Sequence, residues 1–271
     1  MVRSSHTAHF KQASLEQIDA ANQAMHLLDL TNLDENAEEH HILYLTGLAV
    51  KYHVAAVCVY PKYISIARSH IHEAKIKVAT VANFPTGDLP EDTVAHEIES
   101  AINAGADEID VVFPYKKYLA GDVQAALSLV KTAKNICGSN ILLKVILETG
   151  AFNGADDILH ASRDVIASGA DFIKTSTGKI PQGASLVAAI MMLSAIKEAH
   201  EQNRQVGLKI SGGVRHLDQV LQYFALAREI ISSEFIHKDT FRIGASSLLD
   251  ELVKYASGTI PTSFELTKKG K

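Results

Sequence analysis

Four charged residues stand inside short apolar runs of the chain, where charges are unusual. Asp110, Lys144, Lys174 and Lys209 each directly follow an isoleucine or a leucine in such a run. Near-continuous apolar runs of this length are typical of strands buried on both faces. A buried charge is costly unless it is paired or neutralised. The four residues therefore indicate either a structural ion-pair cluster or a reactive site.

A buried lysine has a specific chemical use, because its neutral amine can attack a carbonyl and form a Schiff base. An ordinary lysine, with a pKa of about 10.4, is neutral in only about one molecule in a thousand near pH 7.4. Burial and a neighbouring cation both lower that pKa. Two facing lysines can therefore supply a nucleophile and the cation that activates it, while a nearby carboxylate relays protons. Spacing alone leaves open which lysine is the nucleophile.

Two loops of small residues near the end of the chain could bind phosphate. Gly212 and Gly213 precede one helical pattern, and Gly244, Ser246 and Ser247 precede another. Small residues let backbone N–H groups approach an anion, and a helix N-terminus favours negative charge. Either loop alone is typical of an ordinary turn, but the pair predicts a phosphate site.

Eight short β-rich runs alternate with longer helical patterns, as parallel βαβ units require. The runs are residues 26–31, 54–60, 77–83, 108–113, 141–147, 172–176, 206–210 and 241–245. Asp122, Ser185 and Asp156 or Asp157 can cap helices between them, and Gly138 can end one.

Eight such units in 271 residues predict an α/β protein with one closed (β/α)8 barrel, also called a TIM barrel. An open doubly wound sheet is the alternative. The single domain is expected to span residues 1–271. It includes an N-terminal helical extension over about residues 1–25 and a flexible C-terminal tail over about residues 258–271.

A Gly-Ala-Asp tripeptide recurs before two of the predicted strands, beginning at Gly105 and at Gly169. Asp110 and Lys174 each stand five residues after the glycine. Alternate strands contribute to the same interior layer of such barrels. Equal offsets therefore predict that Asp110 and Lys174 lie at equal depth, two strands apart.

Composition excludes several classes of protein. Apolar residues make up 47% of the chain and charged residues 21%, which is typical of a globular protein. The net charge of −5 argues against a nucleic-acid binder and a polybasic membrane anchor. Two cysteines, Cys58 and Cys137, are too few for a disulfide scaffold and suit a reducing compartment. With no signal-peptide or membrane-length apolar run, we expect a cytoplasmic protein.

Other motifs are weak. His72 and His96 are each followed by glutamate, but neither has the second histidine of a zinc motif, so no metal is expected. No Gly-x-Gly-x-x-Gly follows a strand, so no dinucleotide cofactor is expected. Cys58 is interpreted as a buried, inert thiol. The polar run 34–41 is interpreted as a solvated helix start.

Several runs of the sequence are similar to motifs of the deoxyribose-phosphate aldolase family. The most specific is FIKTSTGK at residues 172–179, accompanied by similar runs at 108–115, 142–150 and 244–247. Residues 28–31, 58–61 and 82–85 also resemble that family. The resemblance extends in order from about residue 25 to about residue 255.

The resemblance implies a class I aldolase, without metal or other cofactor, that reversibly cleaves 2-deoxy-D-ribose 5-phosphate to glyceraldehyde 3-phosphate and acetaldehyde. It implies that Lys174 forms the Schiff base, that Lys209 lowers the pKa of Lys174, and that Asp110 relays protons. The implied phosphate-binding residues are Gly178, Lys179, Gly212, Gly213, Gly244, Ser246 and Ser247. Asp29, Thr31 and Lys144 are expected to line the rest of the pocket.

The resemblance also implies a homodimer or homotetramer that acts on small phosphosugar and aldehyde substrates, with no nucleic-acid or membrane partner. Some family members have a tail tyrosine that assists proton transfer. Here the last tyrosine is Tyr255, so that assistance is absent or comes from another group. Three alternatives remain open: another phosphorylated aldol as substrate, a non-enzymatic phosphosugar-binding barrel, and a metal-dependent aldolase.

Overall fold

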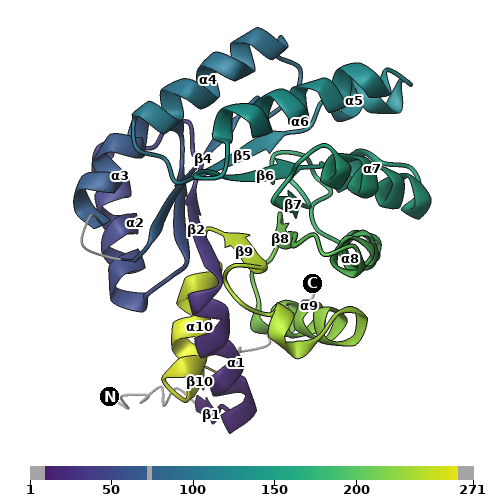
Figure 1. Ribbon diagram of the computed structural model, residues 1–271. Helices are drawn as coiled ribbons and strands as arrows, with labels where there is room; N and C mark the ends of the chain where they lie inside the picture. The colour runs from purple at the N-terminus through teal and green to yellow at the C-terminus, as the bar shows by residue number, and fades with distance from the viewer. Residues whose placement is uncertain (1–9, 72–74, 262–271) are drawn as a thin grey trace, which may run out of the picture.

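The computed structural model describes residues 10–71 and 75–261. Within this part, eight strands close a parallel barrel in the order β2-β3-β4-β5-β6-β7-β8-β9, with helices around its outside (Figure 1). The strands are β2 (Leu28–Asn32), β3 (Ala56–Val59), β4 (Lys77–Ala82), β5 (Glu108–Val112), β6 (Leu142–Ile146), β7 (Phe172–Lys174), β8 (Gly207–Ser211) and β9 (Phe241–Ala245). The predicted barrel is confirmed, and each strand falls on a predicted run.

The helices connect successive strands and form the outer layer of the barrel (Figure 1). They are α1 (Leu15–His26), α2 (Glu39–Tyr52), α3 (Ile64–Ile71), α4 (Glu91–Asn103), α5 (Tyr115–Leu119), α6 (Val123–Cys137), α7 (Ala155–Ala167), α8 (Leu186–Glu201), α9 (Leu217–Ile230) and α10 (Leu248–Ala256). Single 3₁₀ turns occur at Pro61–Tyr63, Thr149–Ala151 and Ser233–Phe235. Across residues 10–71 and 75–261, no helix combines the length and apolarity needed to cross a membrane.

The predicted helix caps are confirmed with one exception. The side chains of Asp122 and Ser185 accept backbone N–H bonds at the starts of α6 and α8, and Gly138 ends α6. For α7 the prediction was wrong, because Gly154 occupies the N-cap position. Asp156 and Asp157 lie instead in the first turn of α7, where a carboxylate favours the helix dipole without capping it.

The two ends of the described chain meet. Strand β1 (Phe10–Gln12) pairs antiparallel with β10 (Thr259–Pro261), beside the packed pair α1 and α10 (Figure 1). Helix α1 falls within the expected N-terminal extension and continues to His26, and Thr259–Pro261, at the start of the expected tail, form β10. Strand pairing with a segment at the other end of the chain orders these residues, and such long-range pairing leaves no local signal. Residues 1–9 and 262–271 lie outside the described part.

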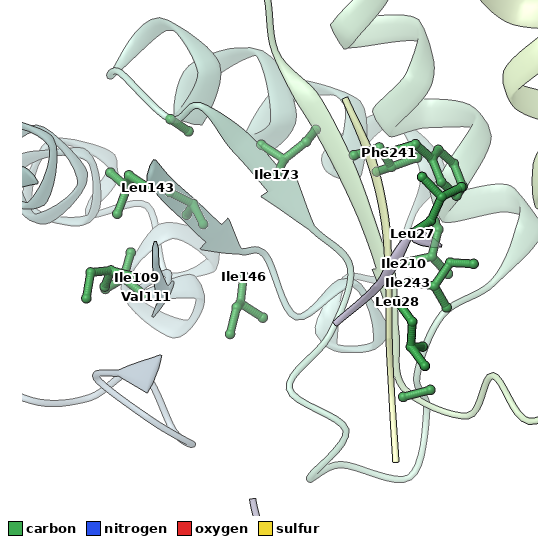
Figure 2. Packing of buried hydrophobic residues seen from close by; sticks show 14 of the residues in the cluster. Leu27, Leu28, Ile109, Val111, Leu143, Ile146, Ile173, Ile210, Phe241 and Ile243 are labelled. Carbon is green, nitrogen blue, oxygen red and sulfur yellow. The ribbon is translucent and has the colours of Figure 1, made fainter. Parts of the chain in front are cut away.

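Side chains alternate along each strand between the barrel interior and the helices. Outward residues such as Ile109, Val111, Leu143 and Ile173 are buried in the apolar layer between strands and helices (Figure 2). A second, smaller apolar group occupies the inward face of β3 and β4 and comprises Ala56, Cys58, Ala79 and Val81. The inward faces of the other strands are where the charges lie.

Strand register places the inward-facing residues in successive layers, and three of these layers hold the buried charges. Asp110 pairs with Lys144, and Lys144 pairs with Phe172. Strands in such a barrel are tilted, so the register shifts by about two residues between one strand and the next but one. The β7 residue at the same height as Asp110 is therefore Lys174 rather than Phe172. Of these three layers, the one nearest the carboxyl ends of the strands is Cys58, Asp110, Lys174 and Gly244; the middle layer is Asp29, Ala79, Lys144 and Lys209; the third is Ala56, Glu108, Phe172 and Arg242. The predicted equal depth of Asp110 and Lys174 is confirmed.

Candidate active site

The three interior layers bring seven charged side chains into one network, which we call the interior charge cluster. Its members are Asp29, Glu108, Asp110, Lys144, Lys174, Lys209 and Arg242, all of them buried. Sequence reasoning did not single out Glu108 or Arg242 for this site. The signal was available, because each occupies an inward position of a predicted strand, two residues before Asp110 and Gly244 respectively.

Asp110 is the centre of the cluster, because its carboxylate contacts three ammonium groups. The Nζ atom of Lys144 donates to Oδ1 at 2.8 Å. The Nζ atoms of Lys174 and Lys209 donate to Oδ2 at 2.8 Å and 2.7 Å. The structure therefore brings together the two lysines and the carboxylate predicted to carry the chemistry.

A second set of ion pairs links the lysines around Asp110 to residues of the middle and third layers. Lys209 Nζ lies 2.5 Å from Asp29 Oδ2, and Arg242 Nη1 lies 2.6 Å from Asp29 Oδ1. Arg242 Nη2 lies 2.9 Å from Glu108 Oε1, and Lys144 Nζ lies 2.6 Å from Glu108 Oε2. Each of Lys144, Lys209 and Arg242 thus contacts at least two carboxylates.

The pKa values of the three buried lysines are shifted in different directions. Burial lowers the pKa of Lys174, and the nearby charge of Lys209 lowers it further, against the opposing effect of Asp110. Burial would also lower the pKa of Lys209 and of Lys144, but their neighbouring carboxylates raise both above the ordinary value. Lys174 is therefore the lysine most readily available as a neutral amine.

The carboxylates are held ionised by these same cations. Burial alone would raise the pKa of Asp110, but Lys144, Lys174 and Lys209 hold it well below its usual range. Asp29 behaves in the same way, its pKa lowered by Lys209, Arg242 and Lys144. Both carboxylates therefore remain negatively charged at neutral pH.

A cavity of about 690 Å³ opens at the carboxyl ends of the strands, and Lys174 lies in its lining. Thr31 also lines it. Asp29 and Lys144, which were expected to line the rest of the pocket, belong to the middle layer and lie beneath the cavity. Of the three clustered lysines, Lys174 alone reaches the cavity, because it lies one layer higher than the other two.

The loops predicted to bind phosphate form one side of this cavity. Its lining includes Gly178, Lys179, Gly212, Gly213, Gly244, Ser246 and Ser247. Gly212 and Gly213 have φ values of 90° and 88°, a left-handed conformation that glycine adopts without strain. The loop with Ser246 and Ser247 leads directly into α10, whose N-terminal N–H groups and dipole favour an anion.

Gly244 has a further packing role. A Cβ atom at this position would lie 2.9 Å from Cε of Lys209 and 3.0 Å from Cβ of Ser211. The missing side chain therefore leaves the room through which Lys209 extends toward Asp110.

Sequence reasoning missed Glu148, which orients the loop after β7. Its carboxylate accepts from the backbone N–H of Thr177 at 3.2 Å and from the Thr177 hydroxyl. Thr177 Oγ1 in turn accepts the backbone N–H of Lys179 at 3.0 Å. Glu148 has φ 57°, which is unusual for a residue other than glycine and marks a constrained position. Its place directly after a predicted strand was the available signal.

The remaining candidates behave as simple structural groups. Cys58 is buried in the same interior layer as Asp110 and Lys174, and burial raises the pKa of its thiol, which agrees with an inert cysteine. His72 lies outside the described residues. Within the described ranges, no group of three His, Cys, Asp or Glu side chains is arranged to hold a metal ion.

Comparison with known proteins assigns the chain to a protein family. Residues 15–252 match the model of the DeoC/LacD family aldolases, a range that extends from the start of α1 into α10 and includes all eight barrel strands. The chain belongs to the DeoC/LacD aldolase family. It is therefore an aldolase, a lyase that makes or breaks carbon–carbon bonds.

Individual members of this aldolase family agree in sequence and in fold. The chain is 42% identical over 246 residues to a deoxyribose-phosphate aldolase of Agrobacterium fabrum, covering 90% of this chain and 94% of that one. It superimposes with a TM-score of 0.81 on a Toxoplasma gondii ME49 structure provisionally described as a deoxyribose-phosphate aldolase, at 25% identity, covering 90% and 96% of the two chains. A tetrameric Aeropyrum pernix deoxyribose phosphate aldolase shares the fold, with a TM-score of 0.69 at 23% identity over 90% and 99% of the chains.

Proposed function

We propose that this aldolase reversibly cleaves 2-deoxy-D-ribose 5-phosphate to glyceraldehyde 3-phosphate and acetaldehyde through a Schiff base on Lys174. The observation that carries the proposal is the position of Lys174. It is the clustered lysine that lies in the cavity lining, and its pKa is lowered while those of Lys144 and Lys209 are raised. The same cavity has the small-residue loops that suit a phosphate.

The reaction follows from an amine at the base of a phosphate-binding cavity. The neutral amine of Lys174 attacks the aldehyde carbon of the open-chain sugar, and loss of water leaves an iminium. Loss of the C3 hydroxyl proton then breaks the C2–C3 bond. The electron pair moves into the iminium, which releases glyceraldehyde 3-phosphate and leaves an enamine. Protonation of the enamine at carbon, followed by addition of water, releases acetaldehyde and restores the amine.

The charged neighbours of Lys174 suit the proton transfers of this cycle. Asp110 is hydrogen-bonded to Lys174 Nζ and is held as a carboxylate, so it can take up and return protons next to the reacting nitrogen. Lys209 shares the same carboxylate oxygen and provides the cation that lowers the pKa of Lys174. In this proposal no metal or other cofactor takes part, so added chelator is expected to leave the rate unchanged.

The function is tested by supplying the purified protein with 2-deoxy-D-ribose 5-phosphate and measuring both products. Glyceraldehyde 3-phosphate and acetaldehyde should appear in equal amounts. Acetaldehyde plus cyanoborohydride should add an ethyl group to one lysine, which peptide mass mapping should identify as Lys174. A protein that neither cleaves the sugar phosphate nor becomes alkylated would contradict the proposal.

We predict that Ser246→Asp raises KM for the phosphorylated sugar by on the order of 10- to 100-fold, because it places a carboxylate where the phosphate must lie. Ser246 lies in the cavity lining just before α10. Unphosphorylated deoxyribose should be affected much less. The matched control is Ser246→Asn, which has the same shape without the charge. Equal losses on both sugars would show that Ser246 does not contact phosphate.

We predict that Lys209→Leu raises the apparent pKa of Lys174 by about one unit, so that trapping requires higher pH. Two effects act in this direction. The neighbouring cation is lost, and Asp110 Oδ2, which Lys209 shares with Lys174, is left to Lys174 alone. Greater desolvation opposes them. The pH dependence of single-turnover trapping measures the result, and an unchanged or lowered pKa in a folded variant would remove Lys209 from this role.

The proposal also includes a cytoplasmic location and a homodimeric or homotetrameric assembly. The absence of a disulfide supports a reducing compartment, since both described cysteines are free and buried. The Aeropyrum pernix relative is described as tetrameric. Light scattering coupled to size-exclusion chromatography will measure the mass in solution against 29.3 kDa for one chain.

A further inference from the structure

The third interior layer holds an arginine and a glutamate that the proposed reaction does not use. Arg242 and Glu108 lie at the end of the cluster opposite the cavity, and neither belongs to its lining. Both are buried, and they contact each other at 2.9 Å. They reach Lys174 only through other charges: Arg242 contacts Asp29, and Glu108 contacts Lys144.

The charges of the interior cluster do not balance when all its lysines are protonated. Four cations, Lys144, Lys174, Lys209 and Arg242, then face three carboxylates, Asp29, Glu108 and Asp110, which leaves one excess positive charge. An uncompensated charge in a buried site is unfavourable. The cluster becomes neutral when one lysine loses its proton.

Contacts within the cluster decide which lysine loses its proton. Lys174 contacts one carboxylate, Asp110, whereas each of the other cations contacts at least two. Lys174 therefore gains least from being charged. A change in the net charge elsewhere in the cluster should accordingly alter the ionisation of Lys174 first.

We propose that Arg242 and Glu108 are positioning residues that control how readily Lys174 loses its proton, by setting the net charge of the interior cluster from its far end. Arg242 supplies the excess cation that favours a neutral Lys174, and Glu108 limits that excess. The inference rests on the proposed function of Lys174 as the Schiff-base amine. It assigns a role in the reaction to two residues that touch neither the cavity nor Lys174.

The titratable groups that act directly on Lys174 are Asp110 on β5, Lys209 on β8, Cys58 on β3 and Glu148 after β6, and none of them is changed in the test. Asp29 on β2 and Lys144 on β6 link these groups to Glu108 and Arg242, the two residues that are varied. Glu148 is bonded to Thr177 rather than to a cation of the cluster. Its charge is the same in every variant, so it does not affect the direction of a difference between variants.

The test measures the pH midpoint of Lys174 alkylation by acetaldehyde and cyanoborohydride in two variants. One variant removes a positive charge from the cluster, and the other removes a negative charge. Arg242→Met removes the excess cation with little change in volume, so the midpoint should move to higher pH by on the order of one unit. Glu108→Gln removes a carboxylate with almost no change in shape, so the midpoint should move to lower pH by a similar amount. A purely structural role would not shift the two midpoints in opposite directions.

Three further variants sharpen the comparison. The double variant Arg242→Met with Glu108→Gln leaves the net charge unchanged, so its midpoint should return close to that of the original protein. Arg242→Lys and Glu108→Asp keep each charge and should each leave the midpoint within a few tenths of a unit. Circular dichroism at each pH verifies that the variants are folded.

The outcomes separate this inference from the proposed function. Suppose that Lys174 is alkylated in the original protein, but the pH midpoints of the two single variants shift in the same direction or do not shift. That result would overturn only the charge-balance role of Arg242 and Glu108. No alkylation of Lys174 in any protein would overturn the proposed function itself. If Arg242→Met does not fold, Glu108→Gln decides the question, because a downward shift supports the inference and any other result contradicts it.

Discussion

Lys174→Ala is expected to lower turnover of 2-deoxy-D-ribose 5-phosphate by at least about 10⁴-fold and to abolish alkylation by acetaldehyde and cyanoborohydride. The reason is that the variant lacks the amine that forms the covalent bond, and the other clustered lysines lie one layer below the cavity. Their pKa values are also raised by contacting carboxylates, so neither can readily serve as a substitute nucleophile.

The matched control for this prediction is Lys254→Ala, which removes an exposed lysine from α10 and should leave both readouts unchanged. Rates are measured by the appearance of glyceraldehyde 3-phosphate, and the modified residue by peptide mass mapping. Alkylation of Lys144 or Lys209 in the original protein, or of any clustered lysine in the alanine variant, would show that Lys174 is not the attacking amine.

Asp110→Asn is expected to lower the free energy of unfolding by about 3–5 kcal/mol and the turnover rate by about 10²- to 10⁴-fold. The substitution preserves shape but removes the charge that three ammonium groups share. The cluster then has one fewer carboxylate against the same cations, and the group placed to move protons beside Lys174 is gone. Denaturant titration measures the first effect and the coupled assay the second.

A surface ion pair provides the control for stability. Asp88 contacts Lys116, and both side chains are half exposed, so Asp88→Asn should cost no more than about 1 kcal/mol. A loss as large as that of Asp110→Asn would show that the burial of the cluster is not the cause of the difference. The same conclusion would follow if Asp110→Asn lowered the free energy of unfolding by as little as Asp88→Asn does.

The stability difference between the original protein and Asp110→Asn should also depend on pH. The pKa of Asp110 is depressed in the folded state from the ordinary value of 3.8, so its contribution is fully present above that value. It should be lost as pH falls below 3.8 toward the depressed pKa, because the unfolded state then binds the proton more readily. A difference that grew on acidification would have the wrong sign for this account.

Much of the barrel is determined by local sequence. Apolar runs of strand length, separated by helical patterns with Asp122 and Ser185 at helix starts, were sufficient to place all eight strands. A strand buried on both faces tolerates few charges, so Asp110, Lys144, Lys174 and Lys209 were visible as exceptions. The repeated offset from glycine even placed Asp110 and Lys174 at one depth, because side-chain direction and rise per residue are regular along a strand.

Residue spacing by itself could not predict which lysine reaches the cavity, because that depends on the stagger of the strands around the closed barrel. The stagger raises Lys174 one layer above Lys144 and Lys209 and leaves Asp29 and Lys144 beneath the cavity floor. Pairing between β1 and β10, and the ion pairs that link Arg242 to Asp29 and Glu108, likewise join residues far apart in the chain. Local patterns record the direction and burial of a side chain, whereas its height and its partners are settled only when the barrel closes.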